Sequence, residues 1–125
     1  MRFDWLVAAV AAFFMLSITA SSTAHSAGAM AIGACAAYGY AFDYTDQARA
    51  ETAALKKCAG RQCRLVLALK KSCAAFAIDG RKPCGAHGYA SAKQLGAAQN
   101  SALKQCYQYG GKDCMIRAFA CDAKG

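Results

Sequence analysis

Ala54-Leu55-Lys56-Lys57-Cys58 recurs in the second half of this chain as Ala102-Leu103-Lys104-Gln105-Cys106. A second pair of matching stretches lies upstream, where Gly39-Tyr40-Ala41 corresponds to Gly88-Tyr89-Ala90. Solenoids stack several repeats, and a unit of this length in only two copies is instead typical of a globular domain with a pseudo-twofold axis. The sequence therefore predicts one duplicated domain.

The cysteines follow the same duplication, with halves at about residues 34–79 and 84–121. Eight cysteines in 125 residues are typical of a disulfide framework in a small exported protein. Equivalent positions near a twofold axis can pair with each other, and the remaining cysteines should pair in the same way within each half. This symmetry favours local pairs and pairs that cross between the halves: Cys58–Cys63 and Cys106–Cys114, then Cys35–Cys84 and Cys73–Cys121.

Residues 1–29 are expected to be a signal peptide. Trp5 to Ile18 is a nearly unbroken apolar run behind a basic start, and its length suits a signal sequence rather than a membrane span. Small residues after the run fit cleavage near residue 24 or 29. Since no later segment could cross a bilayer, we expect residues 30–125 to form a single secreted or periplasmic domain.

Helix-forming residues dominate two stretches, at about 46–58 and 92–106, and both are expected to be helices. Asp43 or Thr45 can cap the first helix, and Ser91 with Gln94 makes a capping box for the second. Alternation from Cys63 to Lys70 predicts a strand with one apolar face. Further candidate strands are residues 36–42, 73–78, 85–90 and 115–121. The predicted fold class is α+β: a duplicated, disulfide-stapled unit with an antiparallel sheet and two helices on one face.

The order of these motifs resembles the domain of unknown function 4189 family of small secreted bacterial proteins. The resemblance rests on Gly-Tyr-Ala before a helix that ends in Ala-Leu-x-x-Cys, then Cys-Arg-Leu-Val, then Ser-Cys-Ala-Ala-Phe-Ala, followed by the same pattern again. It covers about Ala34 to Cys121. Members of the family usually have a Trp-Gly motif where the first strands begin. This chain has no Trp after Trp5, and Cys35 and Cys84 are additions to the family's cysteine pattern. The resemblance implies export, one domain and disulfides, and it implies no activity.

Catalytic, cofactor and metal sites are not expected. The Cys58-x4-Cys63 spacing lacks the two-residue separation of redox-active thiols. Cys84-x2-His87 could supply half of a zinc site, but exported cysteines normally oxidise first. His87 is expected to be a surface or capping residue, and Ser91 lies too close to it along the chain for a nucleophile and its base.

Positive charge is the remaining signal. The chain has 15 Lys+Arg against 7 Asp+Glu, and a net charge of +8 survives signal removal because Arg2 and Asp4 leave together. Such a balance favours acidic partners, here an unknown protein or an anionic envelope polymer. No basic run is interleaved with aromatic residues, which argues against nucleic acid. The expected contact surface combines basic and aromatic residues: Lys56, Lys57, Arg61, Tyr107 and Tyr109.

The sequence thus predicts a secreted, cationic, non-catalytic binding module that acts as a monomer. An envelope-active protein that acts on acidic membranes or cell-wall polymers stays open as an alternative. A small hydrolase or a redox protein is the last alternative function, after these two. Helices with small alanine faces, rather than bulky apolar faces, disfavour the membrane alternative.

Overall fold

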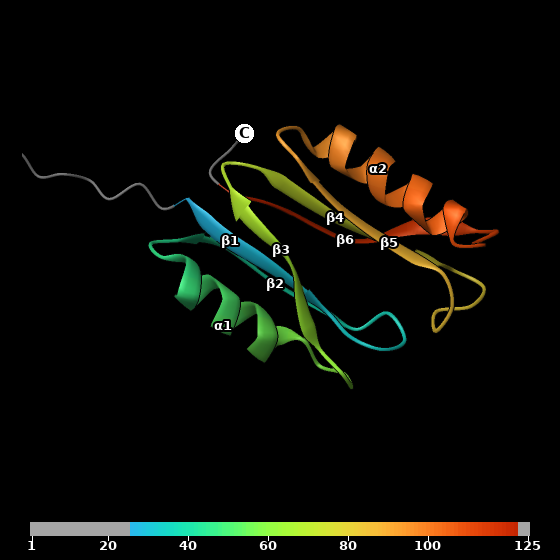
Figure 1. Ribbon diagram of the computed structural model, residues 1–125, viewed down its shortest axis with the longest axis horizontal. Helices are drawn as coiled ribbons and strands as arrows, with labels where there is room; N and C mark the ends of the chain where they lie inside the picture. The colour runs from blue at the N-terminus through green and yellow to red at the C-terminus, as the bar shows by residue number, and fades with distance from the viewer. Residues whose placement is uncertain (1–25, 123–125) are drawn as a thin grey trace, which may run out of the picture.

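The computed structural model describes residues 26–122, which form two copies of one strand–strand–helix–strand unit (Figure 1). The first copy comprises β1 (Ala27–Ile32), β2 (Tyr38–Tyr44), α1 (Gln47–Lys57) and β3 (Arg64–Lys70). The second comprises β4 (Cys73–Asp79), β5 (His87–Ala92), α2 (Leu95–Gln108) and β6 (Cys114–Cys121). Each copy makes an antiparallel three-stranded sheet with its first strand in the centre, in the orders β2-β1-β3 and β5-β4-β6.

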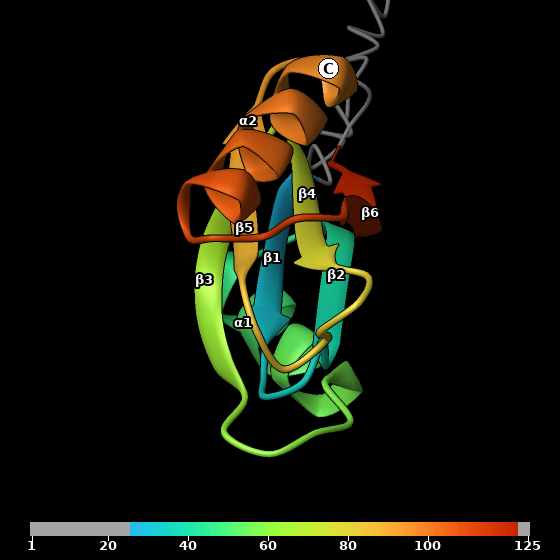
Figure 2. The same cartoon turned by 90° about the vertical axis from the view of Figure 1, so that its right-hand side faces the viewer.

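The two sheets pack face to face, and the helices lie on the two outer sides (Figures 1 and 2). One buried cluster joins Met30 and Leu69 of the first sheet to Phe76 of the second, so it lies between the sheets. Two further clusters lie between each sheet and its own helix. The α+β class, the duplication and the disulfides are therefore confirmed. The expectation of one sheet with both helices on one face is wrong, because each unit brings its own sheet and its own helix.

The central strands explain this layering. Both β1 and β4 are buried along their whole length. In β1, Ala29 and Ala31 belong to the cluster under α1, while the alternate residues Met30 and Ile32 belong to the cluster between the sheets. A strand alternates its side chains between two faces. Small residues therefore face the helix and large residues face the partner sheet.

The unit boundaries differ from the expected halves at residues 34–79 and 84–121. β4 was placed in the first half, but it is the central strand of the second sheet. β1 precedes residue 34 and pairs with both β2 and β3. The last residues of the expected signal peptide (residues 1–29) are described, and Ala27 to Ala29 belong to this central strand. The rest of the expected signal peptide, residues 1–25, lies outside the described residues.

The four disulfides are Cys35–Cys84, Cys58–Cys63, Cys73–Cys121 and Cys106–Cys114, and none of the described cysteines is free. These are the pairs that the duplication predicted. The expectation that Cys73–Cys121 crosses between the halves is wrong, because Cys73 and Cys121 are direct neighbours on β4 and β6 of the same sheet. Only Cys35–Cys84 joins the two units.

Both helix starts differ from the expected capping residues. Asp46, rather than Asp43 or Thr45, caps α1 by accepting a hydrogen bond from the backbone N–H of Arg49. Ser91 lies inside β5, and Gln94 precedes α2 without a side-chain cap. The predicted capping box is therefore wrong, because β5 runs further than the sequence indicated.

Candidate functional site

Four connecting loops gather at one end of the molecule, which lies on the right in Figure 1. Each unit contributes the loop between its first two strands and the loop that follows its helix. We call this region, with the helix and strand ends next to it, the loop end. Its loops are residues 33–37, 58–63, 80–86 and 109–113.

Covalent and hydrogen bonds tie the four loops together. The N–H of Ala34 donates to the carbonyl of Arg61 over 2.8 Å, which joins the first two loops. The Cys35–Cys84 disulfide joins the first loop to the third. The N–H of Gly80 donates to the carbonyl of Asp113 over 2.8 Å, which joins the third loop to the fourth. The loop end is therefore a single connected surface built from both units.

This surface carries much more positive than negative charge. It has two carboxylates, Asp79 and Asp113. Asp113 is exposed and pairs with Arg81 at 3.8 Å, and Asp79 bonds to backbone N–H groups. The basic residues at the loop end are exposed. They are Lys56, Lys57, Arg61, Arg64, Arg81, Lys82 and Lys112.

Asp79 is nearly buried, with 4% of its surface exposed, and it organises two of the loops. Its carboxylate accepts hydrogen bonds from the backbone N–H of Arg81 at 2.9 Å and of Lys112 at 3.2 Å. These bonds, above all the one from Arg81, hold the pKa of Asp79 below its ordinary value even though burial opposes this shift. The negative charge of Asp79 is thus used inside the protein.

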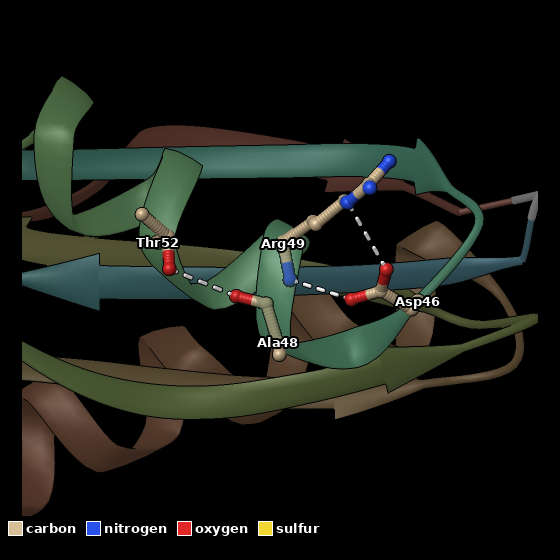
Figure 3. Close-up of polar contacts among 4 residues, drawn as sticks. All are labelled: Asp46, Ala48, Arg49 and Thr52. Carbon is tan, nitrogen blue, oxygen red and sulfur yellow. Dashed lines mark hydrogen bonds and ion pairs between the residues drawn. The ribbon is translucent and has the colours of Figure 1, made fainter.

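Charge is more nearly balanced at the opposite end, which we call the turn end (residues 43–46, 71–72, 93–94 and 122). The buried Asp122 carboxylate accepts the backbone N–H of Asp43 at 2.9 Å and of Lys71 at 3.0 Å. Next to it, Asp46 pairs with the Arg49 guanidinium at 3.3 Å (Figure 3). Figure 3 also shows the Thr52 hydroxyl donating to the carbonyl of Ala48 within α1. Arg49 is therefore already partnered.

All five residues expected to form the contact surface lie at the loop end. Lys56 and Lys57 are the last residues of α1 and line a surface groove of about 560 Å³ along that helix. Arg61 is exposed in the loop that follows. Tyr107 and Tyr109 close α2, with 52% and 75% of their surfaces exposed. Since the helices cover opposite sides, the lysines and the tyrosines share an end but not a face.

A second groove combines Tyr109 with residues that were not expected in the contact surface. It has a volume of about 720 Å³ at the edge where β3 of one sheet meets β5 of the other, and its polar lining includes Arg64, His87, Tyr89, Gln105 and Tyr109. His87 was expected to be a surface or capping residue, but it is half-buried at the start of β5. Only the packing of the two sheets brings these residues together, and no sequence motif indicates it.

The described residues include neither a His87–Ser91 pair within reach nor a group of metal ligands. His87 and Ser91 are four residues apart on β5, a separation of about 13 Å in a strand, so the serine is out of reach of the histidine. Within residues 26–122, no three His, Cys, Asp or Glu side chains are grouped as metal ligands would be. The same described part of the chain contains no helix long and apolar enough to cross a membrane.

Comparison with known proteins adds a family and one structural relative. The family described as "Domain of unknown function (DUF4189)" matches residues 27–121. The NMR structure of Rv1813c from Mycobacterium tuberculosis is similar at 27% identity and a TM-score of 0.58, over 78% of this chain and 76% of that one. No curated protein matches the chain.

Proposed function

The chain belongs to the DUF4189 family of unknown function, and we propose that it is an exported binding module that docks an acidic protein or an anionic envelope polymer at its loop end. The observation that carries the proposal is the distribution of charge. Seven basic side chains at the loop end are exposed, against two carboxylates. Asp79 is buried and bonded to backbone N–H groups, and the exposed Asp113 offsets only Arg81. Such a field attracts an acidic partner and accelerates its encounter.

The disulfides support both export and binding. Four disulfides in a domain of this size suit an oxidising compartment. Three of them, Cys35–Cys84, Cys58–Cys63 and Cys106–Cys114, border or cross the four loops of the loop end. Loops that are held in one arrangement before binding lose less conformational entropy when a partner docks. The scaffold thus favours recognition by a fixed surface.

A non-catalytic role is part of this proposal. All eight cysteines are oxidised, so none of them can act as a thiolate nucleophile. The membrane alternative draws less support, because the helices turn their alanine faces inward. Ala50 and Ala54 of α1 and Ala98 and Ala102 of α2 are buried against the sheets, so neither of these two described helices presents a broad apolar face to a bilayer.

Charge reversal at each end of the molecule tests the proposal. The oxidised domain would be titrated against polyglutamate and against a neutral polymer of similar length, over a range of salt concentrations. The test variant is Lys56→Glu with Lys57→Glu. The matched control is Lys70→Glu with Lys93→Glu, which changes the net charge equally at two exposed positions near the turn end.

The loop-end variant should lose affinity for polyglutamate by about tenfold or more at low salt, and added salt should shrink this difference. The control should lose clearly less, and the neutral polymer should not bind any of the three proteins. Equal losses in the two variants would mean that net charge alone drives association, and the proposal would then be wrong.

A further inference from the structure

We propose that the groove where β3 meets β5 binds a small organic ligand that carries an oxyanion, either a carboxylate or a phosphate. We call this site the edge groove. It lies within the loop end and shares Arg64 and Tyr109 with that surface. It requires no macromolecular partner, however, and would bind its ligand even if the polymer-docking proposal failed. Its lining residues are Arg64, Gly85, Ala86, His87, Tyr89, Gln105, Gln108 and Tyr109.

The charge of the lining indicates the anionic group. Arg64 begins β3 and lines the edge groove, and within residues 26–122 its guanidinium makes no ion pair or hydrogen bond. In the described part of the chain, no Asp or Glu lines this groove. A guanidinium presents a planar fork of donors that matches a carboxylate or a phosphate. An unpaired arginine in a groove without carboxylates therefore favours an oxyanion.

Two neighbouring side chains are already held in place. The Oε1 atom of Gln105 accepts the backbone N–H of Tyr89 at 3.0 Å, so the amide group has its NH₂ end left to donate. The His87 ring packs edge-on against Phe76 at 6.2 Å and stacks on Tyr89 at 6.5 Å. Donors that are fixed before binding cost little entropy to use.

The size and shape of the groove indicate a ligand larger than an inorganic ion. Its volume of about 720 Å³ lies in the range of small-molecule sites. A second hollow of about 330 Å³ shares Arg64 and His87 and continues toward Gly33 and Gln62. Tyr89 and Tyr109 supply aromatic surface beside the polar groups. A ligand with an oxyanion near Arg64 and a ring or chain against the tyrosines would match this arrangement.

The test uses simple probes and the oxidised domain. Phenyl phosphate and benzoate would be titrated separately while amide NMR signals are recorded, and inorganic phosphate and neutral benzamide would serve as comparison probes. The test variant is Arg64→Ala. The matched control is Lys104→Ala, which removes one positive charge from an exposed position beside Gln105 on α2 that does not line the groove.

At least one of the two aromatic anions should produce saturable shifts that centre on Arg64, His87, Gln105 and Tyr109. The stronger probe identifies the ligand class as phosphate or carboxylate. Inorganic phosphate should bind more weakly than phenyl phosphate, and benzamide should not bind. Arg64→Ala should weaken binding by about tenfold or more, as expected for loss of a charged hydrogen bond, whereas Lys104→Ala should change it little.

Three results would overturn the proposal: no saturable shift with either aromatic anion, shifts spread over all basic residues, or equal losses in the two variants. Each result is separable from the polymer experiment, because the small probes contact the edge groove and the polymer experiment changes Lys56 and Lys57, which do not line it. Saturable probe binding that persists in Lys56→Glu with Lys57→Glu would support the edge groove whether or not the polymer binds.

Discussion

Asp79 shows how one side chain shapes the loop end. Its carboxylate accepts the backbone N–H groups of Arg81 and Lys112, and its own N–H and carbonyl bond to Ala86 and Lys82. Two loops of the proposed docking surface are therefore held by one ionised group. Since hydrogen bonds to the charged form lower the pKa of Asp79, ionisation of this residue and the order of these loops are linked.

This linkage predicts how stability depends on pH. Because the pKa is lower in the folded than in the unfolded state, the contribution of Asp79 is complete above the unfolded pKa and is lost as pH falls through the folded value. Asp79→Asn should lower the melting temperature at neutral pH, and this difference should shrink in strong acid.

The control is Asp113→Asn, an exposed carboxylate in a neighbouring loop. It should lower the melting temperature much less at neutral pH. Thermal unfolding followed by circular dichroism over a range of pH measures both effects. A constant gap between the wild type and Asp79→Asn down to strong acid would contradict the linkage.

The sequence predicted the partners of the cysteines but not the roles of Arg64 and His87. The cysteine pairs followed from the duplication, since equivalent residues occupy equivalent places in two copies of one unit. The roles of Arg64 and His87 could not be found in this way. They lie on different units, and their positions are not equivalent, so only the packing of one sheet on the other makes them neighbours.

At the scale of elements, a glycine in the second strand of each unit sets the distance between the sheet and its helix. A Cβ atom on Gly39 would meet the Ala54 carbonyl of α1, and one on Gly88 would meet the Ala102 carbonyl of α2. These glycines begin the Gly-Tyr-Ala motifs, which are one of the two matching pairs of the repeat. The motif is thus conserved between the halves because each helix backbone passes directly over its strand.

Gly39→Ala and Gly88→Ala should each destabilise the domain by about 1–3 kcal/mol or more, because the obstructing atoms are backbone and cannot rotate away. Gly96→Ala in α2 is the control, since a Cβ there meets nothing within 4 Å and alanine favours the helix by up to about 1 kcal/mol. Urea denaturation gives all three free energies of unfolding. A neutral effect at Gly39 and Gly88 would refute the close approach.

The elements were predicted well where their local pattern was regular. Helices expected at 46–58 and 92–106 occur at Gln47–Lys57 and Leu95–Gln108. β1 was missed because its alanines and small residues also fit signal cleavage. The expected apolar face of β3 is interrupted, because a register shift between its pairs with Met30 and Ala31 leaves Leu65 37% exposed. Such a bulge depends on the partner strand and leaves no local signal.

At the scale of the whole molecule, Cys35–Cys84 is the one disulfide that joins the two units, and it spans 49 residues. In the chain-entropy picture, its removal by Cys35→Ala with Cys84→Ala should cost roughly 4 kcal/mol, against roughly 2 kcal/mol for the five-residue span of Cys58–Cys63. Urea denaturation of the two double variants measures both costs. A smaller loss for Cys35–Cys84 than for Cys58–Cys63 would contradict this ranking.

The global arrangement was only partly predictable. Duplication and cysteine spacing predict one stapled α+β domain, but both one sheet and two facing sheets satisfy the same local patterns. Two facing sheets are required because the central strands turn alanines toward a helix and large residues, such as Met30 and Phe76, toward the other sheet. The two faces can be told apart only once the central strands are known. The five residues expected to form the contact surface lie at one end, because each helix leads directly into a loop of the loop end, and their role in contact stays a prediction.

The most direct test of the docking proposal is to map by NMR which amides of the oxidised domain respond to polyglutamate. The proposal predicts that the shifts centre on residues 33–37, 58–63, 80–86 and 109–113, and that added salt reverses them. Shifts centred on residues 43–46, 71–72 and 93–94, or spread evenly over every exposed lysine and arginine, would contradict it.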